Sequence, residues 1–193
     1  MTTSERSDYR YDFYVSYDSS PLVASWIGDV LERLRRTFQA SGIFFQEERR
    51  ENGALDPQIV DAASTSRCMI AVWSPEYFYS RLSWWEWMVF RAREDALSMR
   101  NGTLIAPIQF HDGVHFPPEA KVADKFDVRD YTNLSPAFWG SEGAIEFKRE
   151  LETFTDKLRG LVQGAPPFDP DWPTVDFDEV KPPERPRVAL QRL

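Results

Sequence analysis

The fold is decided by residues 68–91, which read CMIAVWSPEYFYSRLSWWEWMVFR. Residues 68–73 form an unbroken apolar run of strand length, and Ser74-Pro75 is a turn signal. A helical pattern follows, which we expect to run from about Ser83 to about Met99. This order places Glu86 in the first turn of a helix, just past the carboxyl end of a buried strand. Open α/β sheets hold their binding sites at that edge.

Glu86 is an acid among tryptophans, and its position can be explained in two ways. Trp84, Trp85 and Trp87 surround it in the sequence, and a carboxylate in an apolar setting is a candidate for a functional site. The pair Ser83-x-x-Glu86 also fits a capping box, in which the two side chains satisfy each other's backbone N–H groups at the start of a helix. The stretch alone leaves both explanations open.

Strand-like runs alternate with helical patterns along the rest of the chain. We expect strands at residues 11–17, 43–46, 68–73, 103–110 and 125–129, a helix that begins at Pro21 and ends at Gly42, a second that begins at Pro57, and a last one through residues 147–161. This alternation predicts an α/β fold, a flavodoxin-like five-stranded parallel sheet in the order 2-1-3-4-5 with helices on both faces. The first and third strands are then neighbours, so residues 16–19 meet residues 73–86.

The composition fits one globular domain with polar ends. Of the 193 residues, 42% are hydrophobic and 15% aromatic, which is ample for one core and too little for two. We expect a flexible N-terminus at residues 1–8, the domain at residues 9–163, and a Pro-rich C-terminal tail at residues 164–193. The prolines of the tail exclude a helix or a central strand, so the tail is either disordered or a strap fastened through Trp172 and Phe177.

The charge and the residue counts exclude several partners. A net charge of -8 argues against nucleic acid, because binding to phosphates requires a basic face. No apolar stretch approaches the roughly 20 residues that span a bilayer, and the polar first residues lack the hydrophobic region of a signal peptide. We therefore expect a cytoplasmic protein with no membrane partner. With Cys68 as the single cysteine and only 2 histidines, neither a disulfide nor a metal site is expected.

Common catalytic signatures are missing from the sequence. No Gly-x-Gly-x-x-Gly follows the first predicted strand, and there is no phosphate-binding loop with Gly-Lys-Ser. A Gly-x-Ser-x-Gly elbow is absent as well, and no phosphorylatable Asp follows the third predicted strand. These absences argue against a Rossmann-type dinucleotide site, a nucleoside-triphosphatase, an α/β-hydrolase and a receiver domain.

Three segments together resemble Toll/interleukin-1 receptor (TIR) domains. Residues 11–17, YDFYVSY, are similar to the first sequence box of that family, and residues 44–59 are similar to its second strand and following loop. Residues 74–87, SPEYFYSRLSWWEW, resemble the segment Ser-Pro-x-Tyr … Ser-x-Trp-Cys-x-x-Glu-Trp of bacterial members. The resemblance covers about residues 9–162, and the motifs are fairly specific in combination.

The resemblance implies an activity and a site. In enzymes of this family the glutamate at the Glu86 position is catalytic and cleaves the nicotinamide–ribose bond of NAD, giving ADP-ribose or a cyclic isomer. NAD is then the substrate, with no separate cofactor and no metal. The loop at residues 47–53 would gate the pocket. The residues expected to line it are Ser16, Tyr17, Asp18, Ser19, Leu82 and Ser83.

This sequence departs from the family's pattern beside the glutamate. Leu82 stands where the family usually has a Trp, and Ser83 stands where it usually has a Cys. A leucine does not stack on a nicotinamide ring as an indole does, so Trp84 or Trp85 is the candidate to supply that ring.

Two classes of function follow from the resemblance. As an enzyme, the protein would make an NAD-derived signal for a downstream effector protein, or deplete NAD, in bacterial immune defence against phage. As an adaptor, it would act by TIR–TIR assembly without catalysis, and the tryptophans near Glu86 would be interface anchors. Self-association is expected in both cases. Glu86 distinguishes the two classes, because an adaptor does not need a carboxylate at this position and an enzyme does.

Overall fold

The computed structural model describes residues 8–36, 38, 42–46, 55–98, 104–114 and 116–185. Its sheet has five strands in the order β2-β1-β3-β4-β5, and every pair of neighbours is parallel, which confirms the predicted fold class. The strands are β1 (Tyr11–Ser16), β2 (Ile43–Phe44), β3 (Ser66–Trp73), β4 (Ile105–Gln109) and β5 (Phe126–Asp127).

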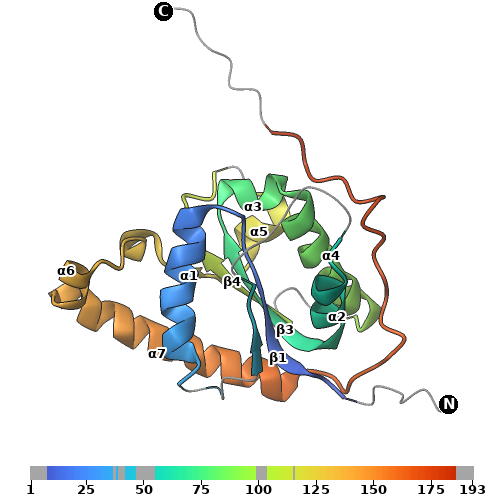
Figure 1. The fold of residues 1–193 in the computed structure, drawn as a ribbon, viewed down its shortest axis with the longest axis horizontal. Helices are drawn as coiled ribbons and strands as arrows, with labels where there is room; N and C mark the ends of the chain where they lie inside the picture. Colours follow the sequence, from blue (N-terminus) through green and yellow to red (C-terminus); the bar gives the residue numbers. More distant parts are fainter. Residues whose placement is uncertain are drawn as a thin grey trace, which may run out of the picture.

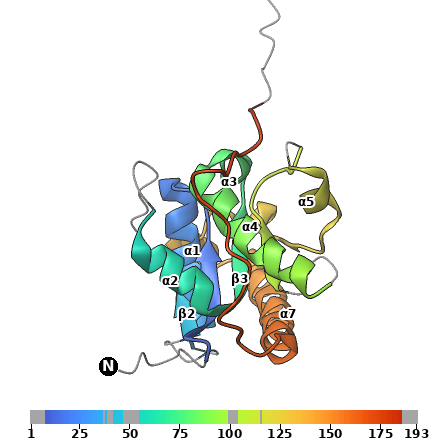
Figure 2. The ribbon, with the colours of Figure 1, turned by 90° about the vertical axis from the view of Figure 1, so that its right-hand side faces the viewer.

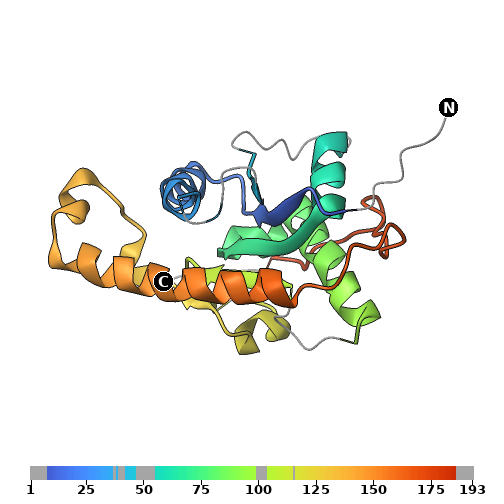
Figure 3. The same cartoon turned by 90° about the horizontal axis from the view of Figure 1, so that it is seen from below.

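Helices cover both faces of the sheet. On one side lie α1 (Pro21–Leu34) and α7 (Glu142–Gly164), and on the other lie α2 (Pro57–Thr65) and α4 (Arg81–Ala96) (Figure 1). The shorter helical pieces are α3 (Pro75–Tyr79), α5 (Pro118–Val122), η2 (Arg129–Tyr131) and α6 (Pro136–Trp139). Seen from below, α6 and the first turns of α7 extend outward beyond α1 (Figure 3).

The central strands are buried on both faces, as expected when helices cover a parallel sheet. Along β3, residues Cys68 to Trp73 are all buried. Pro107 lies inside β4, although proline cannot donate a ladder hydrogen bond. It is tolerated because β5 pairs only with Ile108 and Gln109, so Pro107 has a strand partner on one side alone.

Two predicted helix starts are confirmed, and one predicted helix end is wrong. Pro21 and Pro57 are the first residues of α1 and α2, each following a side chain that caps the helix. α1 ends at Leu34 rather than at Gly42. Gly42 instead lies directly before β2, where a Cβ would come 2.9 Å from the Asp12 carboxylate.

The start of α4 also differs from the expectation. The helix begins at Arg81, and its capping residue is Ser80, whose side chain accepts the backbone N–H of Ser83 at 3.2 Å. Of the two explanations left open for Glu86, the capping box with Ser83 is therefore not formed. The separate helix α3 turns the chain after β3, so Ser80 is the residue with the extended backbone that a cap requires. Glu86 lies in the second turn of α4, and capping does not explain it.

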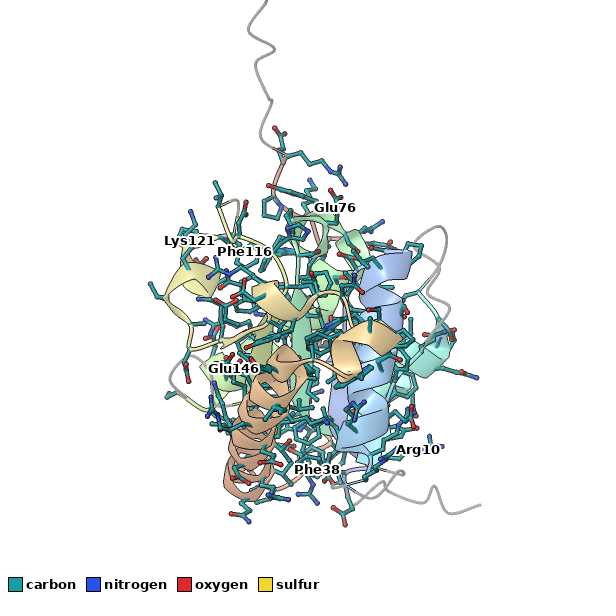
Figure 4. The ribbon with its side chains drawn as sticks, turned by 90° about the vertical axis from the view of Figure 1, so that its left-hand side faces the viewer. Arg10, Phe38, Glu76, Phe116, Lys121 and Glu146 are labelled. Atoms are coloured by element: carbon teal, nitrogen blue, oxygen red, sulfur yellow. The ribbon has the colours of Figure 1, made fainter. Side chains whose placement is uncertain are left out.

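The carboxyl end of the sheet is the end at which α3 follows β3. Glu76 of α3 marks this end, and Arg10 and Phe38 lie at the opposite end (Figure 4). Cys68 in β3 is fully buried, and burial raises the pKa of its thiol to about 12. In the part of the chain that the structure describes, no helix has both the length and the apolar character to cross a bilayer. The same residues include no group of three or more His, Cys, Asp or Glu side chains placed to hold a metal ion.

Candidate functional site

Glu86 of α4 points at β1, and its carboxylate is held by hydroxyl groups. The side chain is 0% exposed. The Tyr14 hydroxyl donates a short hydrogen bond to Oε1, and Ser16 Oγ donates to Oε2 at 2.5 Å. Ser16 Oγ also lies 2.9 Å from the Tyr77 hydroxyl. We call Tyr14, Ser16 and Tyr77 the hydroxyl cage.

The cage follows from the periodicities of one strand and one helix. Tyr14 and Ser16 are two residues apart on β1, so they project from the same face of the sheet. Glu86 and Phe90 are four residues apart on α4, so they lie on the same face of that helix. The Tyr14 ring packs against Phe90, with ring centroids 6.2 Å apart. Tyr14 therefore touches α4 twice, once through its ring and once through its hydroxyl.

A second polar cluster joins the end of β1 to the end of β3. Asp18 is buried and accepts a short hydrogen bond from Ser74 Oγ, and it also accepts the backbone N–H of Ser20 at 2.7 Å. Ser74 in turn caps α3 by accepting the Tyr77 backbone N–H at 3.1 Å. Asp18 thus fixes the turn between β1 and α1 against the start of α3, where the predicted strand order brings these segments together.

The other residues predicted for the pocket have different surroundings. Ser83 Oγ donates to the Tyr17 carbonyl at 3.0 Å, which ties α4 to the residue after β1. The Tyr17 hydroxyl donates to the Gln46 carbonyl at 2.5 Å. Leu82 is buried in the core, whereas Ser19 is exposed. Ser16 and Tyr17 therefore lie next to α4, and Ser83 is part of that helix. The predicted gating loop at residues 47–53 lies outside the described residues.

Three residues of the site were not predicted, namely Tyr14, Tyr77 and Ser74. The signal for Tyr14 was its position two residues before Ser16, on the same face of a strand. An aromatic residue in a strand fits core packing as well, so nothing in the sequence singles out its hydroxyl. Ser74 and Tyr77 lie within residues 68–91, where the sequence indicates a turn at Ser74 and a family motif that includes Tyr77.

Neither tryptophan proposed to replace the missing indole faces the cage. Trp85 is 4% exposed, and its Nε1–H donates to the Val175 carbonyl in the C-terminal tail at 2.8 Å. Trp84 packs edge-on against Trp87, with ring centroids 4.8 Å apart, and against Phe78 of α3. The suggestion that either ring replaces the family's tryptophan beside the glutamate has no support from this arrangement.

The cage closes the carboxylate off from solvent in this structure. Hydrogen bonds to a carboxylate are worth roughly 1.5–3 kcal/mol each, so the two from Tyr14 and Ser16 alone make turning Glu86 out of the cage cost at least about 3 kcal/mol. A cost of that size limits the released fraction to about 10⁻² or less. As it stands, the arrangement ties α4 to β1, and it can act on a ligand only from the released state.

An open surface hollow of about 790 Å³ lies between α1 and the residues after β2, and none of the residues predicted to form the pocket lines it. Phe45 and Gln46 form part of its wall, and the Tyr17 hydroxyl reaches the Gln46 carbonyl. Its remaining lining comes from α1 and the residue that follows it: Ala24, Ser25, Gly28, Asp29, Glu32 and Arg35. Glu86 is not among the lining residues, so the hollow and the carboxylate are separate in this structure.

Comparison with known proteins gives only remote similarities. No protein-family model matches the chain, and no curated protein matches it. The TIR domain of the Toll-related receptor TRR-2 from Hydra magnipapillata is similar at 20% identity and a TM-score of 0.45, over 74% of this chain and 98% of that one. The TIR domains of the activated Roq1 resistosome, which directly recognises the pathogen effector XopQ, are similar at 12% identity and a TM-score of 0.39, over 79% and 84%. Both TM-scores are low, so neither similarity adds weight to an assignment of function.

Proposed function

We propose that this chain is a TIR-type NAD glycohydrolase or cyclase in which Glu86 is the catalytic carboxylate. One observation supports the proposal most. A glutamate that does not cap its helix is held by hydroxyl groups at the carboxyl end of β1, where parallel sheets keep their sites. Ser16, Tyr17, Asp18, Ser19, Leu82 and Ser83 remain the proposed substrate-binding set.

Cleavage of the nicotinamide–ribose bond requires one acidic side chain beside the ribose. When nicotinamide leaves, positive charge develops on the ribose, and a carboxylate beside the ribose stabilises that charge. Nicotinamide departs as a neutral ring from a pyridinium, so no second acid is needed to protonate it. Attack by water on the ribose carbon that nicotinamide has left then gives ADP-ribose. Attack on the same carbon by an atom of the adenine portion gives a cyclic isomer. Glu86 acts after it has left the hydroxyl cage, so we expect a low basal rate from the isolated chain.

The role in the cell belongs to the same proposal. The resemblance to bacterial TIR proteins suggests cytoplasmic antiphage signalling, with self-association of the chain and a product that acts on a downstream effector. The domain at residues 9–163 would hold the whole activity, with the polar N-terminus and the Pro-rich tail outside it. These points rest on the resemblance of the sequence to the family.

A second candidate function is a non-catalytic TIR adaptor that acts by TIR–TIR assembly. The observation that favours it is the complete burial of Glu86, with both carboxylate oxygens accepting hydrogen bonds from β1. In this case the glutamate is a structural tie between α4 and β1, and the protein never needs the released state.

Nicotinamide release from NAD separates the two candidates. The assay uses wild type, Glu86→Gln, and the matched control Glu94→Gln, which alters another fully buried glutamate of α4 two turns further on. If Glu86 is catalytic, Glu86→Gln lowers the rate by about 10²–10³, and Glu94→Gln keeps it near the wild-type value. Equal rates for wild type and Glu86→Gln sink the catalytic assignment. No release by any of the three, at a protein concentration that permits assembly, favours the adaptor.

A further inference from the structure

The C-terminal tail is docked on the helix that carries Glu86. Residues 165–185, which we call the strap, leave the end of α7 and run across α4 toward α3 (Figure 2). Of the two alternatives left open by the sequence, disorder or a strap, the structure shows the strap for these residues. Residues 176–180 form a turn, in which the Val180 N–H donates to the Phe177 carbonyl at 3.3 Å. Val175, Phe177 and Val180 pack against the hydrophobic core.

The middle of the strap holds the first two turns of α4. Trp85 Nε1–H donates to the Val175 carbonyl at 2.8 Å. Arg81 donates to the Phe177 carbonyl through Nη2 at 2.7 Å and through Nε at 3.1 Å. The Arg81 guanidinium also lies 4.3 Å from the centroid of the Phe177 ring, a cation–π contact, and the Trp85 ring meets the same ring edge-on at 6.2 Å. Trp85 is the neighbour of Glu86 in the chain, so the strap is attached to the part of α4 that carries the carboxylate.

On either side of these contacts, the strap is fixed to segments other than α4. Near its start, the Phe168 ring packs edge-on against Tyr9, which precedes β1, with ring centroids 5.2 Å apart. Near its end, Arg185 forms an ion pair with Glu76 of α3, and its guanidinium lies 5.5 Å from the centroid of the Tyr79 ring. Because these anchors do not lie on α4, they remain in place when that helix moves, and the contacts between the strap and α4 are the ones that break.

Release of Glu86 from the hydroxyl cage requires the first turns of α4 to move. The Glu86 side chain is 0% exposed, so it reaches a ligand when the two elements that enclose it separate. One of them, β1, is a central strand held by β2 and β3, whereas α4 lies on the surface of the sheet. The helix is therefore the element that moves. Arg81 and Trp85 belong to the turns that move, so their hydrogen bonds to the strap are lost in the released state.

We infer that the docked strap is an intramolecular clamp that keeps Glu86 in the hydroxyl cage, an inference that rests on the proposed function only for its effect on catalysis. The caged state has the contacts of the strap with α4 and the released state lacks them, so each contact raises the ratio of caged to released molecules. The coupling is reciprocal, because a change that weakens the docking of the strap on α4 raises the released fraction by the same factor. The strap is in this sense autoinhibitory.

Chemical labelling of carboxylates tests the clamp without NAD. A water-soluble carbodiimide with an added amine converts accessible carboxylates to amides, and mass spectrometry of the digested full-length chain gives the rate at each position. Phe177→Ala removes the aromatic ring that the strap places on α4. Phe138→Ala is the matched control, because it also removes a partly buried phenylalanine, one that packs on α7 across the sheet from α4. Glu94, another fully buried glutamate of α4, reports on opening of the whole fold.

Loss of one cation–π contact corresponds to a factor of about 2 to 30 in an equilibrium constant. We therefore expect Phe177→Ala to raise the labelling rate of Glu86 by about 2-fold to 30-fold and to leave the rate of Glu94 at its wild-type value. Phe138→Ala should change neither rate. An unchanged rate at Glu86 in Phe177→Ala overturns the inference. An equal rise at Glu86 and Glu94, or an equal rise at Glu86 in both variants, also overturns it, because the whole domain has then loosened.

Arg81→Ala breaks the same contact from the side of the helix. The Arg81 side chain is 43% exposed, so the fold should tolerate the change, and the labelling rate of Glu86 should rise again. Because Arg81 and Phe177 contact each other, the double variant should raise that rate by less than the product of the two single effects. A double variant that reaches the full product contradicts the clamp, since the two side chains then act independently.

Nicotinamide release by the same proteins separates the clamp from the proposed activity. If both hold, Phe177→Ala releases nicotinamide from NAD faster than wild type by the factor that labelling of Glu86 shows. If labelling of Glu86 rises and none of the proteins releases nicotinamide, the clamp is supported and the proposed activity fails. If wild type releases nicotinamide and Phe177→Ala leaves the labelling of Glu86 unchanged, the clamp is overturned and the activity stands.

Discussion

Replacing Tyr14 with Phe removes one of the hydroxyl groups that hold Glu86, and it leaves the ring packed against Phe90. A hydrogen bond to a charged acceptor is worth about 1.5–3 kcal/mol, and 1.4 kcal/mol corresponds to a factor of ten in an equilibrium constant. The released fraction of Glu86 should therefore rise about 10-fold to 150-fold. If catalysis requires release, nicotinamide production per folded molecule should rise by a similar factor.

The same change should lower the stability of the fold. A loss of 1.5–3 kcal/mol corresponds to a fall in melting temperature of about 3–12 °C for a chain of this length, so rates are measured well below the new midpoint. Tyr77→Phe is the matched control, because it removes a hydroxyl that forms a hydrogen bond with Ser16 Oγ, which in turn donates to the Glu86 carboxylate. Its effect on the rate should be smaller. A lower melting temperature for Tyr14→Phe with an unchanged or reduced rate would refute the idea that the cage restrains a catalytic group.

Two further predictions concern the stability of the fold. Glu94 is buried, and burial raises the pKa of its carboxyl, against the lowering effects of the Leu104 N–H and Arg91. The folded state then holds this proton more tightly than the unfolded state, so wild type should gain stability relative to Glu94→Gln as the pH falls from 7 toward 5. Denaturant unfolding at both pH values measures this, and a difference that does not change with pH contradicts it. Truncation after Gly164 removes the hydrogen bonds from Arg81 and Trp85 of α4 to residues of the C-terminal tail, and it should lower the free energy of unfolding by about 1–4 kcal/mol. An unchanged unfolding midpoint would show that the tail contributes nothing to stability.

The sequence predicted the part of the fold that depends on periodicity. Apolar runs alternating with helical patterns predicted the order of the strands, and that order places the end of β1 beside the end of β3, where Ser16 and Tyr17 contact α4. Glu86 stands out in the sequence as an acid between tryptophans, and the structure places it against Ser16, as the strand order predicts.

The details that the sequence could not predict depend on choices between similar residues or on backbone groups. Ser80 and Ser83 are three residues apart and either can cap a helix, and α3 decides between them because it leaves Ser80 extended. The hydroxyl of Tyr14 has no sequence signal distinct from the packing of its ring. Arg81 and Trp85 of α4 hold the C-terminal tail through backbone carbonyl groups. Every residue carries a carbonyl group, so a sequence pattern could not distinguish a docked tail from a disordered one.

The structure of the Glu86→Gln variant with NAD bound tests the central claim most directly, because the loss of the carboxylate should preserve the substrate. The account predicts that the side chain at position 86 leaves Tyr14 and Ser16 and lies within about 3.2 Å of the ribose that carries nicotinamide. It also predicts that Tyr17, Asp18 or Ser83 contacts the same nucleotide. A side chain at position 86 that stays hydrogen-bonded to β1, with NAD bound elsewhere, would contradict the account.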